Sequence, residues 1–276
     1  MGITMESHQI YIHQNRSETN NTGTTVESHQ LHQHNTRRNM GTVSDADRAF
    51  HRSRVYELLA HAFGQPAEEF FTFLQDREFI NNFQEALNLT WQVTVKDIEE
   101  AIKDVSSVNF QTLNTWYNGL VNPTINRFYE CKYHHPFSAM EEMADIAGFY
   151  NAFGVFVEEE RPDYLSMELE FMRLLALKEA KATVISDMEN REICHNAQKK
   201  FLESHLGRWT DTLVKVTGQT KFYAPLSRFL HEWITRECEF SGVTPGELYW
   251  SYKDENEETT EYKCSAIEEG CKDEKI

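Results

Sequence analysis

The segment FGVFVEEERPDYLSMELEFMRLLALKEA, residues 153–180, is strongly patterned and predicts a helix that starts beside its proline. Arg161 precedes that proline and is therefore disfavoured in a helix, whereas Pro162 suits the first helical position. Asp163 then places a carboxylate at the positive end of the helix dipole. The pattern predicts a helix over about 163–184.

Two stripes of side chains are expected along this helix. An apolar stripe with the spacing i, i+4, i+7 and i+11 should face the core and consists of Leu165, Leu169, Met172 and Ala176. A polar stripe on another side consists of Asp163, Ser166, Glu170 and Arg173. Glu168 lies at the centre of neither stripe. The residues alone allow a purely structural interpretation, in which Asp163 supports the helix start and Glu170 pairs with Arg173.

Helical periodicity also dominates the sequence on both sides of this segment. An apolar face in the residues before Gly64 predicts a first helix, and Gly64 and Pro66 are the signal that ends it. The segment PAEEFFTFLQ then begins with the proline and early acids that are typical of the start of a second helix. Further helices are expected over about 77–89, 95–105, 109–121, 138–153, 187–215 and 222–240. No convincing strand pair or repeat interrupts them. We therefore expect an all-α domain of roughly eight to ten helices, with one longer loop over residues 121–138.

The two ends of the chain have a different composition from the middle. Residues 1–44 are rich in Asn, Gln, Thr, Ser and His and poor in large apolar residues, so they are expected to form a disordered tail. Residues 253–276 are polar and rich in acids, and we expect a second flexible tail there. The sequence thus predicts one globular helical domain over residues 45–252.

Charge and hydropathy exclude several classes of protein. The 276 residues include 27 Lys and Arg against 44 Asp and Glu, a formal charge of −17, which disfavours binding to nucleic acid or to anionic membranes. No apolar run reaches the roughly 20 residues of a membrane helix, and no secretory signal begins the chain. Five widely spaced cysteines without a C-x-x-C pair argue against both a disulfide framework and a structural zinc site. We expect a cytoplasmic protein.

Candidate catalytic and metal motifs are sparse. Glu192 and His195 have the Glu-x-x-His spacing of a di-iron site, but such a site needs a second copy of this motif and the sequence has none. Cys131, His134 and His135 lie close together in a predicted loop, but a fourth metal ligand is missing. No phosphate-binding loop occurs. The sequence therefore predicts no enzyme, no catalytic residue, no metal site and no cofactor. A generic helical interaction adaptor and a metal-dependent helical enzyme remain as alternatives.

Three motifs together resemble the TorD/DmsD/NarJ family of redox-enzyme maturation chaperones. RPDYLSMELEFM (161–172) is similar to the family signature, YECKYHHPFSAMEEMADIAGFYNAFGV (129–155) to the stretch before it, and RSRVYELLAHAFGQP (52–66) to the first helix. The resemblance extends over roughly residues 48–240. It is closest to chaperones that accompany ethylbenzene dehydrogenase, dimethylsulfide dehydrogenase and the selenate and chlorate reductases. Tyr164 stands where many relatives have histidine, so no role of a titrating histidine is expected there.

This resemblance implies a helical chaperone that binds the immature catalytic subunit of a molybdopterin oxidoreductase until its molybdenum cofactor is inserted. Some members also cover a twin-arginine leader. Acids would hold the leader's guanidinium groups and aromatic rings its apolar segment. The residues expected to bind the client are Asp163, Tyr164, Glu168, Glu170, Phe171, Tyr150 and Phe153. The acids are expected to be exposed, so that their removal would cost little stability.

Overall fold

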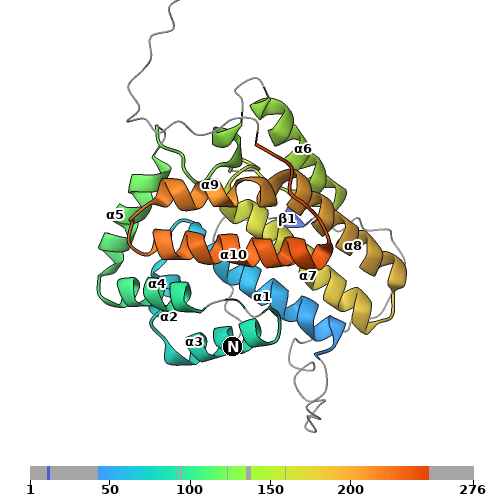
Figure 1. Ribbon diagram of the computed structural model, residues 1–276, viewed down its shortest axis with the longest axis horizontal. Helices are drawn as coiled ribbons and strands as arrows, with labels where there is room; N and C mark the ends of the chain where they lie inside the picture. Colours follow the sequence, from blue (N-terminus) through green and yellow to red (C-terminus); the bar gives the residue numbers. More distant parts are fainter. Residues whose placement is uncertain are drawn as a thin grey trace, which may run out of the picture.

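The computed structural model describes residues 11–12, 43–91, 93, 95–122, 124–134, 138–158 and 160–248. The acidic tail predicted over residues 253–276 lies outside these residues, as does most of the polar tail predicted over residues 1–44. The described chain is helical almost throughout, which confirms the predicted all-α class (Figure 1).

Most helices follow one another with short connections. The helices are α1 (Asp45–Phe63), α2 (Glu68–Phe73), α3 (Arg77–Asn88), α4 (Lys96–Ser106), α5 (Phe110–Val121), α6 (Ala139–Ala152), α7 (Leu165–Val184), α8 (Met188–Phe201), α9 (Gly207–Thr217) and α10 (Tyr223–Ser241). Longer segments join α5 to α6 and α6 to α7. A 3-10 turn (Glu130–Tyr133) lies inside the predicted loop over 121–138, and a π-helical turn (Leu202–Leu206) joins α8 to α9. Two short strands, β1 (Tyr11–Ile12) and β2 (Val155–Phe156), pair antiparallel.

The helix of the opening segment, α7, lies at the centre of the molecule. It packs along α1 on one side and along α8 on another, while α10 crosses in front of them beside α9 (Figure 1). The predicted apolar stripe is confirmed, because Leu165, Leu169, Met172 and Ala176 are all fully buried. Met167, Phe171 and Leu175 are buried as well, so α7 is apolar around most of its circumference, as expected of a helix surrounded by others.

Local sequence signals explain how α1 begins and ends. The Ser44 hydroxyl accepts a hydrogen bond from the Asp47 backbone N–H at 3.1 Å, which caps the first turn. Asp45 and Asp47 place negative charge at the positive end of the helix dipole. The helix ends at Phe63, directly before the glycine of the predicted stop signal. The Ser44 cap therefore fixes the N-terminus of α1, the helix on which Arg52 of the site described below is located.

The π-helical turn interrupts what the sequence predicted as one helix over about 187–215. Its wider turn brings the Leu202 carbonyl so close to Gly207 that a side chain at this position would clash with that oxygen and with the Pro245 ring. Glycine is therefore required where α9 starts. Such turns often mark functional positions, and this one carries the buried His205.

Candidate functional site

The signature segment enters the core through a short backbone bridge. The Glu130 N–H donates to the Asp163 carbonyl at 2.9 Å, and the Leu165 N–H donates to the Phe128 carbonyl at 2.8 Å. These bonds keep the chain extended, so α7 begins at Leu165 and not at Pro162 as predicted. Pro162 lies in the turn before the helix.

Asp163 holds this turn together and is fully buried. Its carboxylate accepts two hydrogen bonds from the Arg161 guanidinium, at 2.9 and 2.6 Å, and one from the Cys131 backbone N–H at 3.1 Å. The Arg161 side chain remains 45% exposed, so the ion pair reaches from the core to the surface. Asp163 is therefore a structural link between the signature and the 3-10 turn, and the expectation that it is exposed is wrong.

Tyr164 is buried between three parts of the chain. Its hydroxyl donates to the Phe63 carbonyl at 2.8 Å and lies 2.7 Å from the hydroxyl of Tyr117. Because the proton of Tyr164 is used in the first bond, Tyr117 is the donor in the second. Its ring packs on Tyr129, with centroids 5.1 Å apart. Burial raises its pKa well above the ordinary value, so the hydroxyl stays protonated. The tyrosine joins α1, α5 and the signature through an aromatic ring and a hydroxyl.

The two glutamates of the signature have different environments. Glu168 is fully buried; one oxygen lies 3.4 Å from the indole N–H of Trp209 and the other has no hydrogen-bond partner among the described residues. Burial and the nearby Glu130 charge raise the pKa of Glu168 well above its usual range. Glu170 is half-buried and pairs with Arg173 at 2.7 Å, as the structural interpretation predicted. The expected exposure is thus wrong for Glu168.

Three of the four aromatic residues predicted to meet a client pack together. The Tyr150 hydroxyl donates to the Pro162 carbonyl at 2.8 Å, and its ring centroid lies 4.9 Å from that of Phe171. Phe153 packs on the same phenylalanine at 5.8 Å and is partly exposed. Tyr150 and Phe171 are buried. Of the seven residues predicted at this site, only Glu170 and Phe153 therefore reach the surface, and their binding to a client stays a prediction.

A histidine–carboxylate cluster, consisting of Glu130, His134, Glu142, Asp145 and His205, lies beside the signature. His134 Nε2 lies 3.0 Å from Glu130 Oε1, and its Nδ1 lies 3.1 Å from Glu142 Oε1. His205 lies 3.3 Å from Glu130 through Nδ1 and 3.0 Å from Asp145 through Nε2. Although burial alone would raise the pKa of Glu130, the two histidines lower it below its usual range. Glu130 is thus ionised, while neighbouring Glu168 is kept neutral.

An arginine network, consisting of Arg52, Glu179, Gln198 and Glu237, connects four helices. The fully buried Arg52 guanidinium donates to Glu237 at 2.6–3.0 Å, to Glu179 at 3.0 Å and to Gln198 at 2.7 Å. Burial would lower the pKa of Arg52, but the charges of Glu237 and Glu179 raise it above its usual value. The Tyr56 hydroxyl and the Trp91 indole also donate to Glu237. The network therefore fixes α1, α7, α8 and α10 together.

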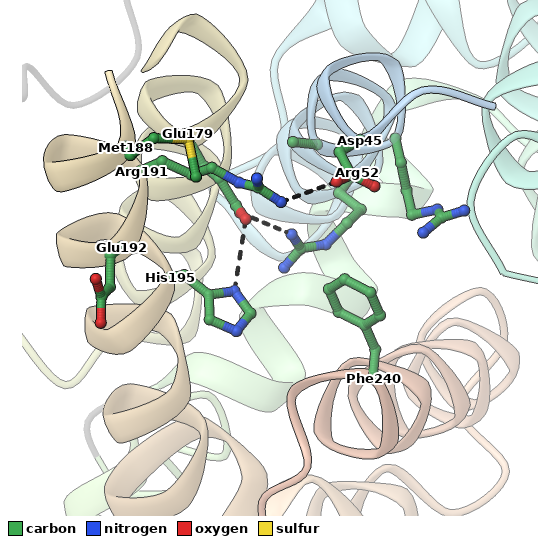
Figure 2. A pocket seen from close by; sticks show the side chains of 10 residues that line it. Asp45, Arg52, Glu179, Met188, Arg191, Glu192, His195 and Phe240 are labelled. Carbon is green, nitrogen blue, oxygen red and sulfur yellow. Dashed lines mark hydrogen bonds and ion pairs between the residues drawn. The ribbon is translucent and has the colours of Figure 1, made fainter. Parts of the chain in front are cut away.

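A pocket of about 310 Å³ opens at the outer side of this network. Figure 2 shows Glu179 between Arg52 and His195, with the Phe240 ring beside them and the ion pair of Arg191 with Asp45 at the edge. The Arg48 guanidinium lies 6.0 Å from the Phe240 ring centroid. The pocket combines an aromatic wall with charges of both signs.

The other motifs weighed from the sequence do not assemble catalytic sites among the described residues. His195 lies 3.5 Å from Glu179 while Glu192 is exposed, so the Glu-x-x-His pair does not converge. The Cys131 sulfur lies 3.4 Å from the Ala139 carbonyl, and Cys131 does not belong to the group of described residues whose ligand atoms converge. His135 lies outside the described residues.

Sequence reasoning missed the residues that are brought together from far apart. Arg52 and Glu237 are 185 positions apart, and no local pattern connects them. His205 gave no recognisable signal, because it stands in the mixed sequence LESHL. Glu130 and His134 stand four positions apart, a spacing that allows contact but does not predict it, and their side chains lie 3.0 Å apart.

In the part of the chain that the structure describes, no helix is long and apolar enough to cross a membrane. A family model described as nitrate reductase delta subunit matches residues 84–215, from α3 to α9. The chain is also 27% identical over 210 residues to the perchlorate reductase assembly chaperone protein of Dechloromonas aromatica (strain RCB), an alignment that covers 71% of this chain and 92% of the relative. Together with the signature motifs and the all-helical fold, these matches make the chain similar to the TorD/DmsD/NarJ family of redox-enzyme maturation chaperones.

Proposed function

We propose that this protein is a dedicated cytoplasmic assembly chaperone without catalytic activity. It binds the immature catalytic subunit of a molybdopterin oxidoreductase of the DMSO-reductase family and releases it once the molybdenum cofactor is in place. Where that subunit has a twin-arginine leader, the chaperone covers it. The observation that carries this proposal is the alignment with an assembly chaperone over 92% of that relative's length.

Exposed apolar side chains at the turn between α7 and α8 provide a surface for such a client. Val184, Ile185 and Met188 are each more than 60% exposed, and Met188 also lines the pocket of Figure 2. Clustered exposed apolar residues commonly mark protein-binding surfaces. We call these three residues the α7–α8 surface and propose that it holds an apolar segment of the client.

The signature residues take two roles in this proposal. Glu170 and Phe153, which are partly exposed, contact the client directly. Asp163, Tyr164, Glu168, Phe171 and Tyr150 are buried and would meet the client only after the signature separates from the 3-10 turn. While the signature and the 3-10 turn stay together, these five buried residues stabilise the backbone that carries Glu170 and Phe153.

Capture of the cofactor-free catalytic subunit by the purified chaperone tests this surface. Met188→Ser should weaken capture about tenfold or more, because burying a methionine is worth roughly 1.5–3 kcal/mol. Met140→Ser is the matched control, since Met140 is 77% exposed on α6, away from the α7–α8 surface. Equal capture by the two variants would contradict the assigned surface, and failure of the wild-type protein to capture the subunit would contradict the function.

A second measurement separates a maturation chaperone from a generic adaptor. The same capture is repeated with the catalytic subunit after cofactor loading. A maturation chaperone should bind the empty subunit at least about tenfold more tightly, a difference of about 1.4 kcal/mol, because binding must end when assembly is complete. Equal binding to both forms would support the adaptor. Deletion of a client's leader shows separately whether the leader contributes to capture.

A further inference from the structure

We propose that the histidine–carboxylate cluster is a binding site for one divalent transition-metal cation of the zinc type. The ligands are Glu130, His134, Glu142 and His205, which supply two imidazole nitrogens and two carboxylates. Ligand atoms of Glu130, His134 and Glu142 all lie within 4.8 Å of one another. This inference is independent of the client-binding surface.

The separations between these groups suit a small tetrahedral cation. Zinc bonds of about 2.0–2.1 Å in a tetrahedral site place neighbouring ligand atoms roughly 3.3 Å apart. Glu130 Oε1 lies 3.0 Å from His134 Nε2 and 3.3 Å from His205 Nδ1. His205 Nδ1 lies 3.9 Å from Glu142 Oε2. Glu130, His134 and Glu142 form the inner group of ligands, and the His205 ring has to move toward His134 to complete the site.

The ring nitrogens of the two histidines are the second observation that points to a cation. All four ring nitrogens of His134 and His205 face carboxylate oxygens. A neutral imidazole has only one N–H to donate. A metal ion satisfies these carboxylates without requiring a proton on every nitrogen.

Charge and surrounding contacts favour the same ligand. Glu130, Glu142 and Asp145 bring three carboxylates together, and Arg208 is the neighbouring cation, 3.2 Å from Glu142. Asp145 contacts the second nitrogen of His205, the arrangement that commonly orients a metal-binding histidine. Its side chain is 63% exposed, so solvent and ions reach the cluster from this side.

The ion would act by fixing structure. It would join the 3-10 turn, α6 and the π-helical turn, which are distant in the sequence. The pocket of Figure 2 shares no residue with the cluster, so this pocket brings no substrate to the ion. Mixed nitrogen and oxygen ligands favour zinc over magnesium.

Thermal unfolding of the chelator-treated full-length protein, with and without Zn²⁺, tests this site. Binding to the folded state alone should raise the Tm by about 5–10 °C at a zinc concentration one hundred times the Kd. His8, His13, His29, His32 and His34 are unchanged in every variant, so any zinc that they bind cancels in the comparison with the wild type. Mg²⁺ at the same concentration should leave the Tm unchanged.

Glu142→Gln removes one ligand with almost no change in volume, and its partly exposed position should allow folding. The zinc-dependent rise in Tm should be lost in this variant and in His134→Gln, and kept in Glu141→Gln, which changes an exposed neighbour. Equilibrium dialysis should show one zinc fewer per chain in the two ligand variants. No zinc-dependent rise in the wild type, or an equal rise in Glu142→Gln, would overturn the proposal.

Discussion

Arg52 and Arg54 stand two positions apart on α1 but have opposite environments. Arg52 is buried and bonded to two glutamates, whereas the Arg54 side chain is 54% exposed and pairs with Glu57 alone. Arg52→Leu should lower the free energy of unfolding by about 3–5 kcal/mol, because it leaves a buried carboxylate without its partner. Arg54→Leu should cost about 0–1 kcal/mol. Urea denaturation of both variants measures the difference, and equal costs would show that the arginine network does not stabilise the fold.

Tyr164 supplies a second prediction at the scale of single residues. Tyr164→Phe removes the hydroxyl that serves both Tyr117 and the Phe63 carbonyl, and leaves buried polar groups without partners. The free energy of unfolding should fall by about 1–3 kcal/mol. Tyr129→Phe is the control, since that hydroxyl makes one long contact of 3.3 Å with Glu160. A cost for Tyr164→Phe no larger than that of the control would mean that the ring alone matters at this position.

At the scale of an element, α7 offers two leucines in different surroundings. Leu169 is fully buried, whereas Leu177 on the same helix is 39% exposed. Leu169→Ala should therefore cost about 2–5 kcal/mol through lost burial and a cavity, and Leu177→Ala should cost less than about 1 kcal/mol. Chemical denaturation checks both values. A cost below about 1 kcal/mol for Leu169→Ala would mean that this face of α7 is not tightly packed.

The elements that sequence reasoning predicted correctly are those with a regular pattern. The expected helices over 95–105, 109–121 and 222–240 agree with α4, α5 and α10 within one or two residues. The helix α7 starts two residues after the predicted residue 163, because hydrogen bonds with residues 128–131 hold the preceding turn. The π-helical turn was missed because it preserves the apolar pattern while adding a residue to one turn.

The candidate site was predictable only in part, since its parts come from distant positions. Three aromatic residues predicted at the site, Tyr150, Phe153 and Phe171, do lie together. The burial of the signature residues was not predictable from one helix, because it depends on neighbours such as Trp209 and Phe201 that cover them. The sequence of α7 shows where Glu168 stands on the helix, but the burial of Glu168 depends on side chains from other helices.

At the scale of the whole molecule, the arginine network connects helices from both ends of the described chain. Glu179 on α7 meets Arg52 of α1 and Gln198 of α8, and Arg52 in turn meets Glu237 of α10. Loss of one charge in this network affects the packing of all four helices. The stability of the whole molecule should therefore depend on the ionisation of Glu179.

Acid should weaken the fold through this carboxylate. Burial alone would raise the pKa of Glu179, but its contacts with His195, Arg52 and Gln198 lower it from 4.5 to about 2. Because the pKa is lower in the folded state, the ionised carboxylate contributes stability above about pH 4.5, and this contribution is lost as the pH falls toward 2. It amounts to about 3 kcal/mol at neutral pH. Glu179→Gln should therefore be less stable than the wild type at pH 7, and the difference should shrink toward zero near pH 2.

Glu192→Gln is the control for this pH dependence, since it replaces an exposed carboxylate that lines the same pocket. Its free energy of unfolding should follow that of the wild type at every pH. Urea denaturation from pH 7 to pH 2 measures the free energy of unfolding of all three proteins. The ionisation of Glu179 then appears as the pH-dependent difference between the wild type and Glu179→Gln. A constant difference between the wild type and Glu179→Gln across this range would mean that the carboxylate stabilises α7 by packing and hydrogen bonding, without the charge that pairs it with Arg52.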